Sequence, residues 1–197
     1  MTTIVDYGAG NLRSVQNTLE ALGSEFEVTN RPQIVSASHK LILPGVGHFG
    51  QMMRALDDLN LRKPILERIR AGVPFLGICA GLQSLFESSE ESPETSGFGI
   101  FPGAVRRFTG DARIPHMGWN SLCQRADSRL LAGIPDPRFT YFAHSYYAPV
   151  IDATAATCTY MQPYSAVLEK DNTYAVQFHP EKSGDIGLRV MRNFIDL

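Results

Sequence analysis

The sequence has little net charge, few cysteines and no long apolar run. Its 197 residues include 18 lysines and arginines against 20 aspartates and glutamates, so the formal net charge is −2. A nearly neutral chain offers no electrostatic attraction for nucleic acid or for an anionic membrane. An apolar run long enough to cross a bilayer is missing, as are the basic start and apolar core of a secretion signal. We therefore expect a cytoplasmic protein, with neither nucleic acid nor membrane among its partners.

The number and spacing of the three cysteines argue against disulfides and against a metal site. Cys79, Cys123 and Cys158 are an odd number and lack metal-ligand spacing, which favours free thiols in a reducing compartment. A chain of this length can bury enough apolar surface to fold without a disulfide or a structural metal. We expect one domain over residues 1–197 that needs no metal and no cofactor. Cys123 and Cys158 lie in strand-like runs and are predicted to pack in the core.

Cys79 stands in a different setting, the run FLGICAGLQSLF over residues 75–86. An apolar strand breaks there at a cysteine with a glycine two residues to either side, and a helix is predicted to follow. This is the pattern of a nucleophile elbow with sulfur in place of oxygen, in which Gly77 and Gly81 give the backbone room to cross closely. A helix N-terminus favours the thiolate. A lone cysteine between glycines can also be a small buried residue at a tight turn.

A second motif, VQFHPE over residues 176–181, ends a strand in a histidine with a carboxylate two positions on. His179 can act as the base and Glu181 can orient it, which together with Cys79 completes a nucleophile, base and orienter. A histidine after a strand can also be purely structural. Both motifs follow apolar strands, however, and open α/β sheets bind ligands at the carboxyl ends of their strands. The two motifs together favour catalysis by Cys79.

The pattern of apolar runs predicts an α/β fold. In the first half, strands at 3–6, 26–29, 40–43 and 74–78 alternate with helices at 12–22, 51–59 and 64–71, which is typical of βαβ units. A turn is expected at residues 8–10, with Asn11 capping the first helix. The nearly continuous apolar strands indicate burial on both faces.

The second half is richer in aromatic and β-branched residues. Strands are predicted at 100–108, 118–123, 139–146, 154–160, 165–169 and 174–178, with a hairpin turn at 170–172 and a final helix at 184–197. The predicted fold is a three-layer open mixed sheet, with a mostly parallel core, antiparallel additions and helices on both faces.

Three motifs together resemble the class I glutamine amidotransferases: GICAG at 77–81, PGVG at 44–47 and QFHPE at 177–181. The resemblance covers most of the chain. Four further strings are similar to the glutaminase subunits of imidazole glycerol phosphate synthase within that class: DYGAGN at 6–11, PHMGWN at 115–120, YFAHSY at 141–146 and HPEKS at 179–183. The string at 115–120 is the most discriminating.

The resemblance implies hydrolysis of glutamine to glutamate and ammonia through a covalent thioester. The ammonia would pass to a separate cyclase subunit of (β/α)8 fold, which makes imidazole glycerol phosphate and AICAR in histidine biosynthesis. Cys79 would attack the amide carbon, while His179 transfers protons and Glu181 orients it. The oxyanion would be stabilised by backbone N–H groups at Ala80 and at Val46 or Gly47. Glycines in the 44–47 loop could let its peptide switch orientation.

Further roles follow from the same resemblance. The substrate-binding residues would be Gln83, Glu91, Ser145 and Tyr146, and the partner interface would include Asn11, Trp119, Tyr141 and Lys182. Glu90 and Glu91 could instead be a solvated charge pair, and a lone tryptophan such as Trp119 is often a core residue. His116 and His144 are expected to be architectural. The elbow departs from the family at Ala80 and Leu82, where Leu and Met are usual.

Three alternatives stay open on the sequence alone. Another class I glutaminase would lack the strings at 115–120 and 141–146. A stand-alone cysteine hydrolase of similar fold would turn over its substrate without a partner. A non-catalytic scaffold subunit would be expected to have lost one of Cys79, His179 and Glu181, all of which are present.

Overall fold

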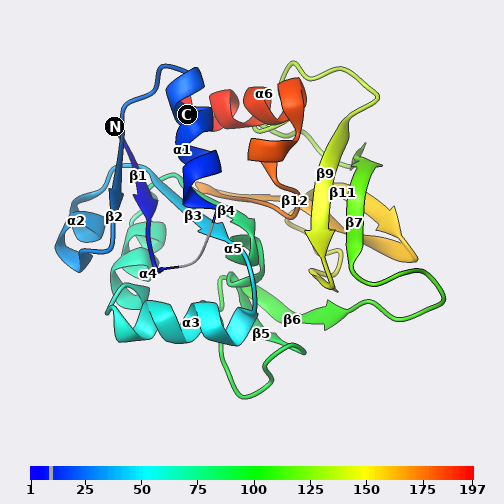
Figure 1. Ribbon diagram of the computed structural model, residues 1–197, viewed down its shortest axis with the longest axis horizontal. Helices are drawn as coiled ribbons and strands as arrows, with labels where there is room; N and C mark the ends of the chain where they lie inside the picture. Colours follow the sequence, from blue (N-terminus) through cyan, green and yellow to red (C-terminus); the bar gives the residue numbers. More distant parts are fainter. Residues whose placement is uncertain (9–10) are drawn as a thin grey trace.

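A single eight-stranded sheet organises the computed structural model, which describes residues 1–8 and 11–197 (Figure 1). Its strands lie in the order β2 (Phe26–Thr29), β1 (Thr2–Val5), β3 (Leu41–Gly45), β4 (Phe75–Cys79), β13 (Thr173–Val176), β12 (Gln162–Lys170), β11 (Thr154–Tyr160) and β8 (Cys123–Gln124). Strands β2 to β13 in this order are parallel, and β12, β11 and β8 continue the sheet antiparallel. The predicted mixed sheet with a mostly parallel core is confirmed.

Helices cover both faces of the sheet (Figure 1). One face packs against α1 (Leu12–Ala21) and α6 (Gly184–Ile195), and the other against α2 (Pro32–Ala37), α3 (Phe49–Asp58) and α4 (Arg62–Arg70). Successive residues of β3 point to opposite faces of the sheet. Ile42 packs in the core beneath α1 and α6, while Leu41 and Leu43 pack in the core beneath α2, α3 and α4. Burial on both faces explains why these strands read as continuous apolar runs.

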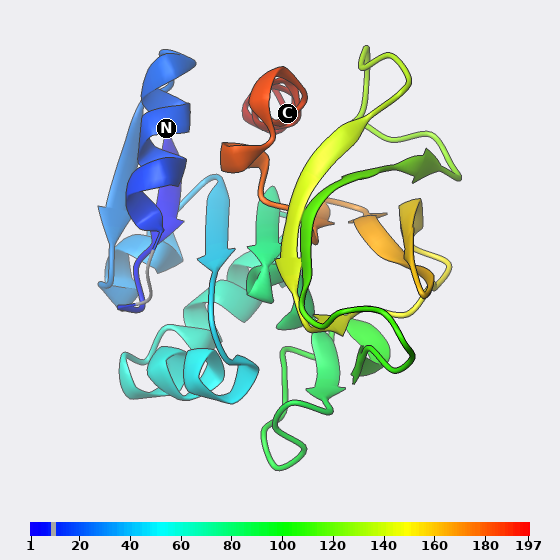
Figure 2. The same cartoon turned by 45° about the vertical axis from the view of Figure 1, so that its right-hand side comes forward.

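Two smaller sheets flank the central one. Strands β10 (Tyr146–Tyr147), β6 (Phe101–Arg107) and β5 (Phe86–Ser89) form one, and β7 (His116–Ser121) and β9 (Phe139–His144) form a curved antiparallel ribbon (Figure 2). The ribbon is tied to the segment that leads from β13 into the 3-10 helix η1 (Pro180–Lys182), because the N–H of His179 donates to the carbonyl of Tyr141 at 2.9 Å. A surface ribbon and the end of a central strand are therefore directly connected.

The structure differs from the sequence predictions at several points. The helix after Cys79, α5 (Ala80–Gln83), has four residues, because Phe98 and Ile100 donate backbone hydrogen bonds to the carbonyls of Ser84 and Leu85 and draw the chain into β5. The predicted continuation of the helix was therefore wrong, and α2 and β5 were not predicted. The predicted hairpin turn at residues 170–172 is confirmed, since Lys170 of β12 pairs with Thr173 of β13 and Asp171 between them has φ 53°.

Three local predictions concern the Asn11 cap, the positions of Cys123 and Cys158, and the turn at residues 8–10. Asn11 precedes α1 but its side chain makes no capping hydrogen bond, since it turns to another partner. Cys123 is exposed rather than packed in the core, whereas Cys158 is buried. The predicted turn at 8–10 falls partly on residues 9 and 10, which lie outside the described residues. Among the helices described, none has the length and apolar character that crossing a bilayer requires.

Candidate active site

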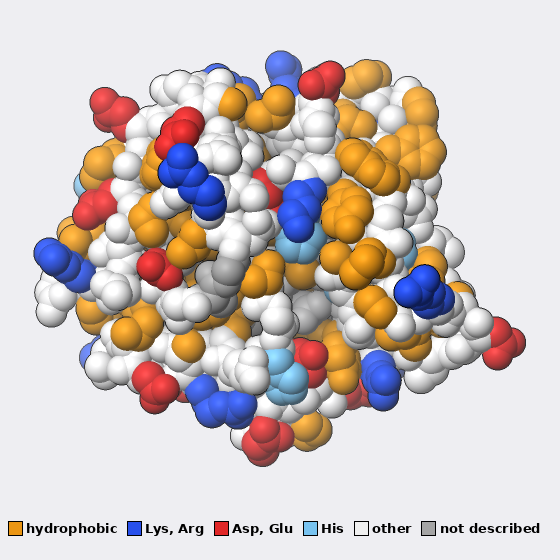
Figure 3. Space-filling view, in the orientation of Figure 1, with side chains coloured by type: hydrophobic (Ala, Val, Ile, Leu, Met, Phe, Trp, Pro, Cys, Tyr) orange, Lys and Arg blue, Asp and Glu red, His pale blue; other side chains and the backbone are white. Residues whose placement is uncertain are grey.

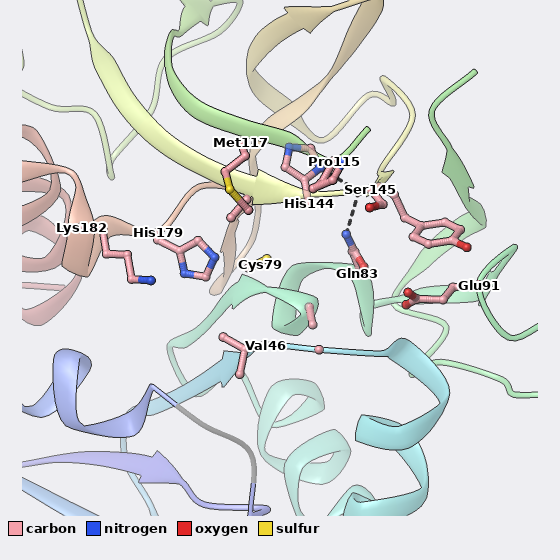
Figure 4. Close-up of a pocket in the computed structure, with 14 residues that line it drawn as sticks. Val46, Cys79, Gln83, Glu91, Pro115, Met117, His144, Ser145, His179 and Lys182 are labelled. Atoms are coloured by element: carbon pink, nitrogen blue, oxygen red, sulfur yellow. Dashed lines mark hydrogen bonds between the residues drawn. The ribbon is translucent and has the colours of Figure 1, made fainter. Parts of the chain in front are cut away.

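The candidate site lies where three adjacent parallel strands end. Gly45 at the end of β3 pairs with Cys79 at the end of β4, and β13 runs beside β4 into His179. Parallel strands deliver their carboxyl ends to one edge of the sheet, so these residues converge although they are far apart in sequence. A cavity of about 370 Å³ opens there (Figure 4), a size within the usual range for small-molecule sites.

Most of the residues singled out from the sequence line this cavity. They are Val46, Gly47, Cys79, Ala80, Gln83, Glu91, Ser145, Tyr146, His179 and Lys182. Glu181 lies behind His179, and Asn11 contacts Glu181. The fold thus gathers the predicted nucleophile, base and substrate residues around one hollow. Among the described residues, we find no cluster of three side chains suited to holding a metal ion.

Close backbone packing shapes the elbow at Cys79. A Cβ at Gly77 would lie 2.6 Å from the carbonyl oxygen of Gly81, and one at Gly45 would collide with the backbone N of Gly81. Three chain segments therefore cross at distances that only glycine allows. Cys79 itself has φ 54° and ψ −107° as it turns from β4 into α5. This conformation is costly for a residue with a side chain, and it is of the kind found where a fold over-determines a functional position.

His179 is held between Cys79 and Glu181. Its Nδ1–H donates to Oε1 of Glu181 at 2.8 Å, and the side chains are 4% and 2% exposed. The other side of the ring lies beside Cys79 (Figure 4). Burial alone would lower the pKa of His179, but the hydrogen bonds and negative charges of Cys79 and Glu181 outweigh it and raise the pKa to about 10. The imidazole is therefore protonated at neutral pH and faces the sulfur as a cation.

The 44–47 loop forms the opposite wall. Gly47 has φ +90°, a conformation that favours glycine, and no heavy atom lies within 4 Å of where its Cβ would be. Gly45, in contrast, is glycine because of its contact with α5. The expectation that both glycines confer freedom therefore needs revision: the open space is at Gly47 alone. The backbone N–H groups of Val46, Gly47 and Ala80 all belong to residues that line the cavity.

The two acidic residues after β5 have separate attachments. Oε2 of Glu91 accepts the N–H of Phe49 at 2.7 Å, while Oε2 of Glu90 accepts the N–H of Arg107 at 2.8 Å. Only Glu91 lines the cavity. They are therefore not a merely solvated pair, because each carboxylate fixes a backbone segment, and Glu91 also presents negative charge to the cavity.

A hydrophobic surface borders the cavity mouth. Trp119 is 57% exposed and packs edge-on against Tyr141 with 6.1 Å between ring centroids, so it is not a core residue. Lys182 Nζ lies 5.9 Å from the Tyr141 ring centroid. Met117 and Phe139 on the same ribbon are 65% and 47% exposed and were not noticed in the sequence. Figure 3 shows hydrophobic side chains gathered over β7 and β9 beside a hollow in this face.

Sequence reasoning also missed Gln177, whose side-chain Nε2 donates to Cys79 Sγ at 3.6 Å. The signal was available, because Gln177 is part of the QFHPE string and precedes His179 by two residues on the same strand end. The buried histidines, in contrast, are as expected. Burial lowers the pKa of His116 to about 4 and that of His144 to about 3, so both are neutral.

Residues 3–197 match the family model described as glutamine amidotransferase class-I. A solved structure described as a glutamine amidotransferase has a TM-score of 0.78 at 19% identity, covering 98% of this chain and 97% of that one. A glutamine amidotransferase from Thermotoga maritima has a TM-score of 0.66 at 15% identity, covering 99% of this chain and 80% of that one. These structures share the fold, and the family match shows that the chain belongs to the class I glutamine amidotransferases.

More similar relatives are found within that class. A protein from Methanothermobacter thermautotrophicus named imidazole glycerol phosphate synthase subunit HisH is 48% identical over 100% of this chain and 98% of its own length. Proteins of the same name from Thermococcus kodakarensis and Deinococcus radiodurans are 46% and 45% identical, over 98% and 97% of this chain and 98% and 91% of their own lengths. The chain is thus a HisH-family member of the class.

Proposed function

We propose that this protein is the glutaminase subunit of an imidazole glycerol phosphate synthase. It hydrolyses glutamine and passes ammonia to a separate cyclase subunit of (β/α)8 fold, with which it forms a cytoplasmic heterodimer. The cyclase uses the ammonia to make imidazole glycerol phosphate and AICAR for histidine biosynthesis. The proposal is carried by the cavity in which Cys79 meets His179, in a chain 48% identical over its whole length to a relative of that name.

The chemistry begins with the Cys79 thiolate. Its sulfur attacks the side-chain amide carbon of glutamine, the C–N bond breaks, and His179 gives its proton to the departing ammonia. Water then attacks the thioester carbon while neutral His179 takes its proton, and glutamate leaves as the C–S bond breaks. Glu181 holds the Nδ1–H tautomer throughout, because it accepts that proton's hydrogen bond at 2.8 Å.

A negative oxygen forms in both half-reactions and needs N–H donors. We assign this role to the backbone of Ala80 and of Val46 or Gly47, which border Cys79 in the cavity. The conformation at Gly47 leaves space around its Cα, so the peptide beside it can turn. We infer that it rests turned away in the isolated chain, and that partner binding favours the productive orientation.

The amino-acid end of the substrate has complementary groups in the cavity. The Glu91 carboxylate pairs with the substrate ammonium, and the Gln83 side-chain oxygen and the backbone at Ser145 and Tyr146 bind the remaining polar atoms. The Tyr146 carbonyl already accepts from Gln83 at 2.9 Å, so its N–H is the group left for substrate. The docking face for the cyclase comprises Asn11, Trp119, Tyr141 and Lys182, beside the cavity mouth. Residues 1–197 act as one amidotransferase domain.

The test is glutamine hydrolysis by the chain alone, with the cyclase, and with the cyclase plus a cyclase ligand. We expect a low rate alone and an increase of about 5- to 150-fold on activation, the range of typical coupling energies. A rate that is high and equal in all three would support a stand-alone hydrolase. A folded chain that binds the cyclase but never hydrolyses glutamine would support a scaffold subunit.

A further inference from the structure

Gln177 is fully buried and directly follows β13, between the nucleophile and the substrate-binding residues. Its Nε2 lies 3.6 Å from Cys79 Sγ, and its Oε1 lies 3.2 Å from Gln83 Nε2. Neither the mechanism above nor the sequence motifs assigned it a role. A buried amide usually satisfies both ends with hydrogen bonds, so its position beside a reacting sulfur calls for an explanation.

The orientation of the Gln177 amide follows from its neighbours. The Tyr146 carbonyl can only accept, so the group of Gln83 that faces it at 2.9 Å must be its NH2. That same NH2 also faces Gln177, which must therefore present its oxygen to Gln83. The NH2 of Gln177 is then left pointing at Cys79 Sγ. The Tyr146 carbonyl thus fixes the orientation of the Gln83 amide, which in turn fixes that of the Gln177 amide, so that the NH2 of Gln177 faces the sulfur.

His144 reinforces this arrangement from the other side. Its Nδ1–H donates to the same Tyr146 carbonyl at 2.8 Å. This second hydrogen bond keeps in place the oxygen from which the series of hydrogen bonds to Cys79 begins. Because burial keeps His144 neutral, it adds no charge to this series of hydrogen bonds. The donor at Cys79 is therefore held by contacts that do not depend on bound substrate.

We propose that Gln177 is a catalytic residue that stabilises the Cys79 thiolate through its side-chain N–H. A 3.6 Å contact is a hydrogen bond to sulfur, whose radius exceeds that of oxygen, and a donor to an anion is worth more than one to a neutral group. His179 supplies the positive charge on one side of the sulfur, and Gln177 supplies a neutral donor that cannot be lost as pH rises. The inference rests on the proposed role of Cys79 as nucleophile.

The test is alkylation of the isolated chain by iodoacetamide, followed by mass spectrometry of the cysteine peptides across a pH series. Gln177→Leu removes the donor at similar volume, and Gln177→Met does so with a more flexible side chain in case the first variant packs poorly. In both variants we expect the midpoint of the Cys79 pH–rate curve to lie about one pH unit higher, so that at pH values below the wild-type midpoint Cys79 reacts about tenfold more slowly. Exposed Cys123 and buried Cys158 report reagent activity and folding in the same sample.

Gln83→Leu provides a second measurement, because Gln83 acts on the sulfur only through Gln177. It should raise the midpoint by less than Gln177→Leu does, and adding it to Gln177→Leu should change nothing further. A midpoint for Cys79 that stays at the wild-type value in folded Gln177 variants would overturn the proposal, even if the rate fell equally at every pH. Because alkylation needs neither glutamine nor the cyclase, this failure is distinguishable from failure of the proposed function.

Discussion

Asn11 Nδ2 donates to Oε1 of Glu181 at 2.6 Å, the same oxygen that accepts the His179 Nδ1–H at 2.8 Å. A residue that precedes α1 and belongs to the proposed docking face therefore shares the carboxylate that binds His179, the proposed base. Movement of the Asn11 side chain on partner binding would be transmitted to His179 through one shared oxygen atom.

We predict that Asn11→Ala lowers kcat for glutamine in the assembled complex by about 10-fold with little change in KM, because a hydrogen bond to a charged group contributes about 1.5–3 kcal/mol. Asn11→Asp should lower it further, since two carboxylates would then face each other. Asn17→Ala, on the exposed side of the same helix, is the matched control. Equal activity of Asn11→Ala and Asn17→Ala would remove Asn11 from the catalytic arrangement.

The Glu181 carboxylate should matter less than the nucleophile. Glu181→Gln keeps the size of the side chain but removes the charge beside His179, so we expect a drop in kcat smaller than that caused by loss of Cys79. Steady-state kinetics of the two variants in the same complex give the comparison. Equal losses would indicate that Glu181 does more than orient the imidazole.

Lys182 and Trp119 should couple the two reactions. Lys182 follows Glu181 directly, and its Nζ lies over the Tyr141 ring. The backbone carbonyl of Tyr141 in turn accepts the N–H of His179. Lys182→Ala and Trp119→Ala should therefore leave the fold intact but weaken association, or consume more than one glutamine per product formed. Lys63→Ala on α4 is the control. Among the residues described, the only ion pair of Lys63 is with Glu67, an exposed residue on the same helix. Normal cyclase affinity together with a one-to-one ratio in both variants would show that the docking face is wrongly assigned.

Acid should destabilise the protein through its buried histidines. The pKa values of His116 and His144 are lowered by burial to about 4 and about 3, so between pH 6.5 and those values the unfolded chain binds protons that the native protein does not. The stability that these two neutral imidazoles contribute is complete above pH 6.5 and falls as the pH drops below that value, by up to about 1.4 kcal/mol per pH unit for each imidazole. Urea unfolding of His144→Gln should show a shallower fall between pH 6 and 5 than wild type or the exposed control His39→Gln. An unchanged slope would mean that His144 does not titrate in this way.

The sequence predicted the parallel core well, because strands buried on both faces and separated by amphipathic helices leave a strong local pattern. It failed where non-local contacts decide the outcome. The helix after Cys79 ends at Gln83 because residues 98–100 take the carbonyls of Ser84 and Leu85, and nothing local to the helix indicates this.

The same distinction holds for the site. Cys79, His179 and Glu181 stand out as motifs. The structure brings Cys79 and His179 to one cavity, as the parallel topology requires, with Glu181 bound to His179 behind it. The partner of Asn11 lies 170 residues away and that of Gln177 lies 98 residues away, so their contacts could not be read from spacing. Cys123 was misplaced because β8 is a two-residue edge strand, whose side chains are exposed.

The most direct measurement is of Cys79→Ala in the assembled complex, with product formation followed separately from glutamine and from added ammonium salt. The variant removes only the nucleophile, so we predict complete loss of glutamine hydrolysis and of glutamine-dependent synthesis, with ammonium-dependent synthesis at the wild-type rate. Retention of glutamine-dependent synthesis would contradict the role of Cys79. Loss of both activities in a complex that still assembles would contradict the division of labour between the two subunits.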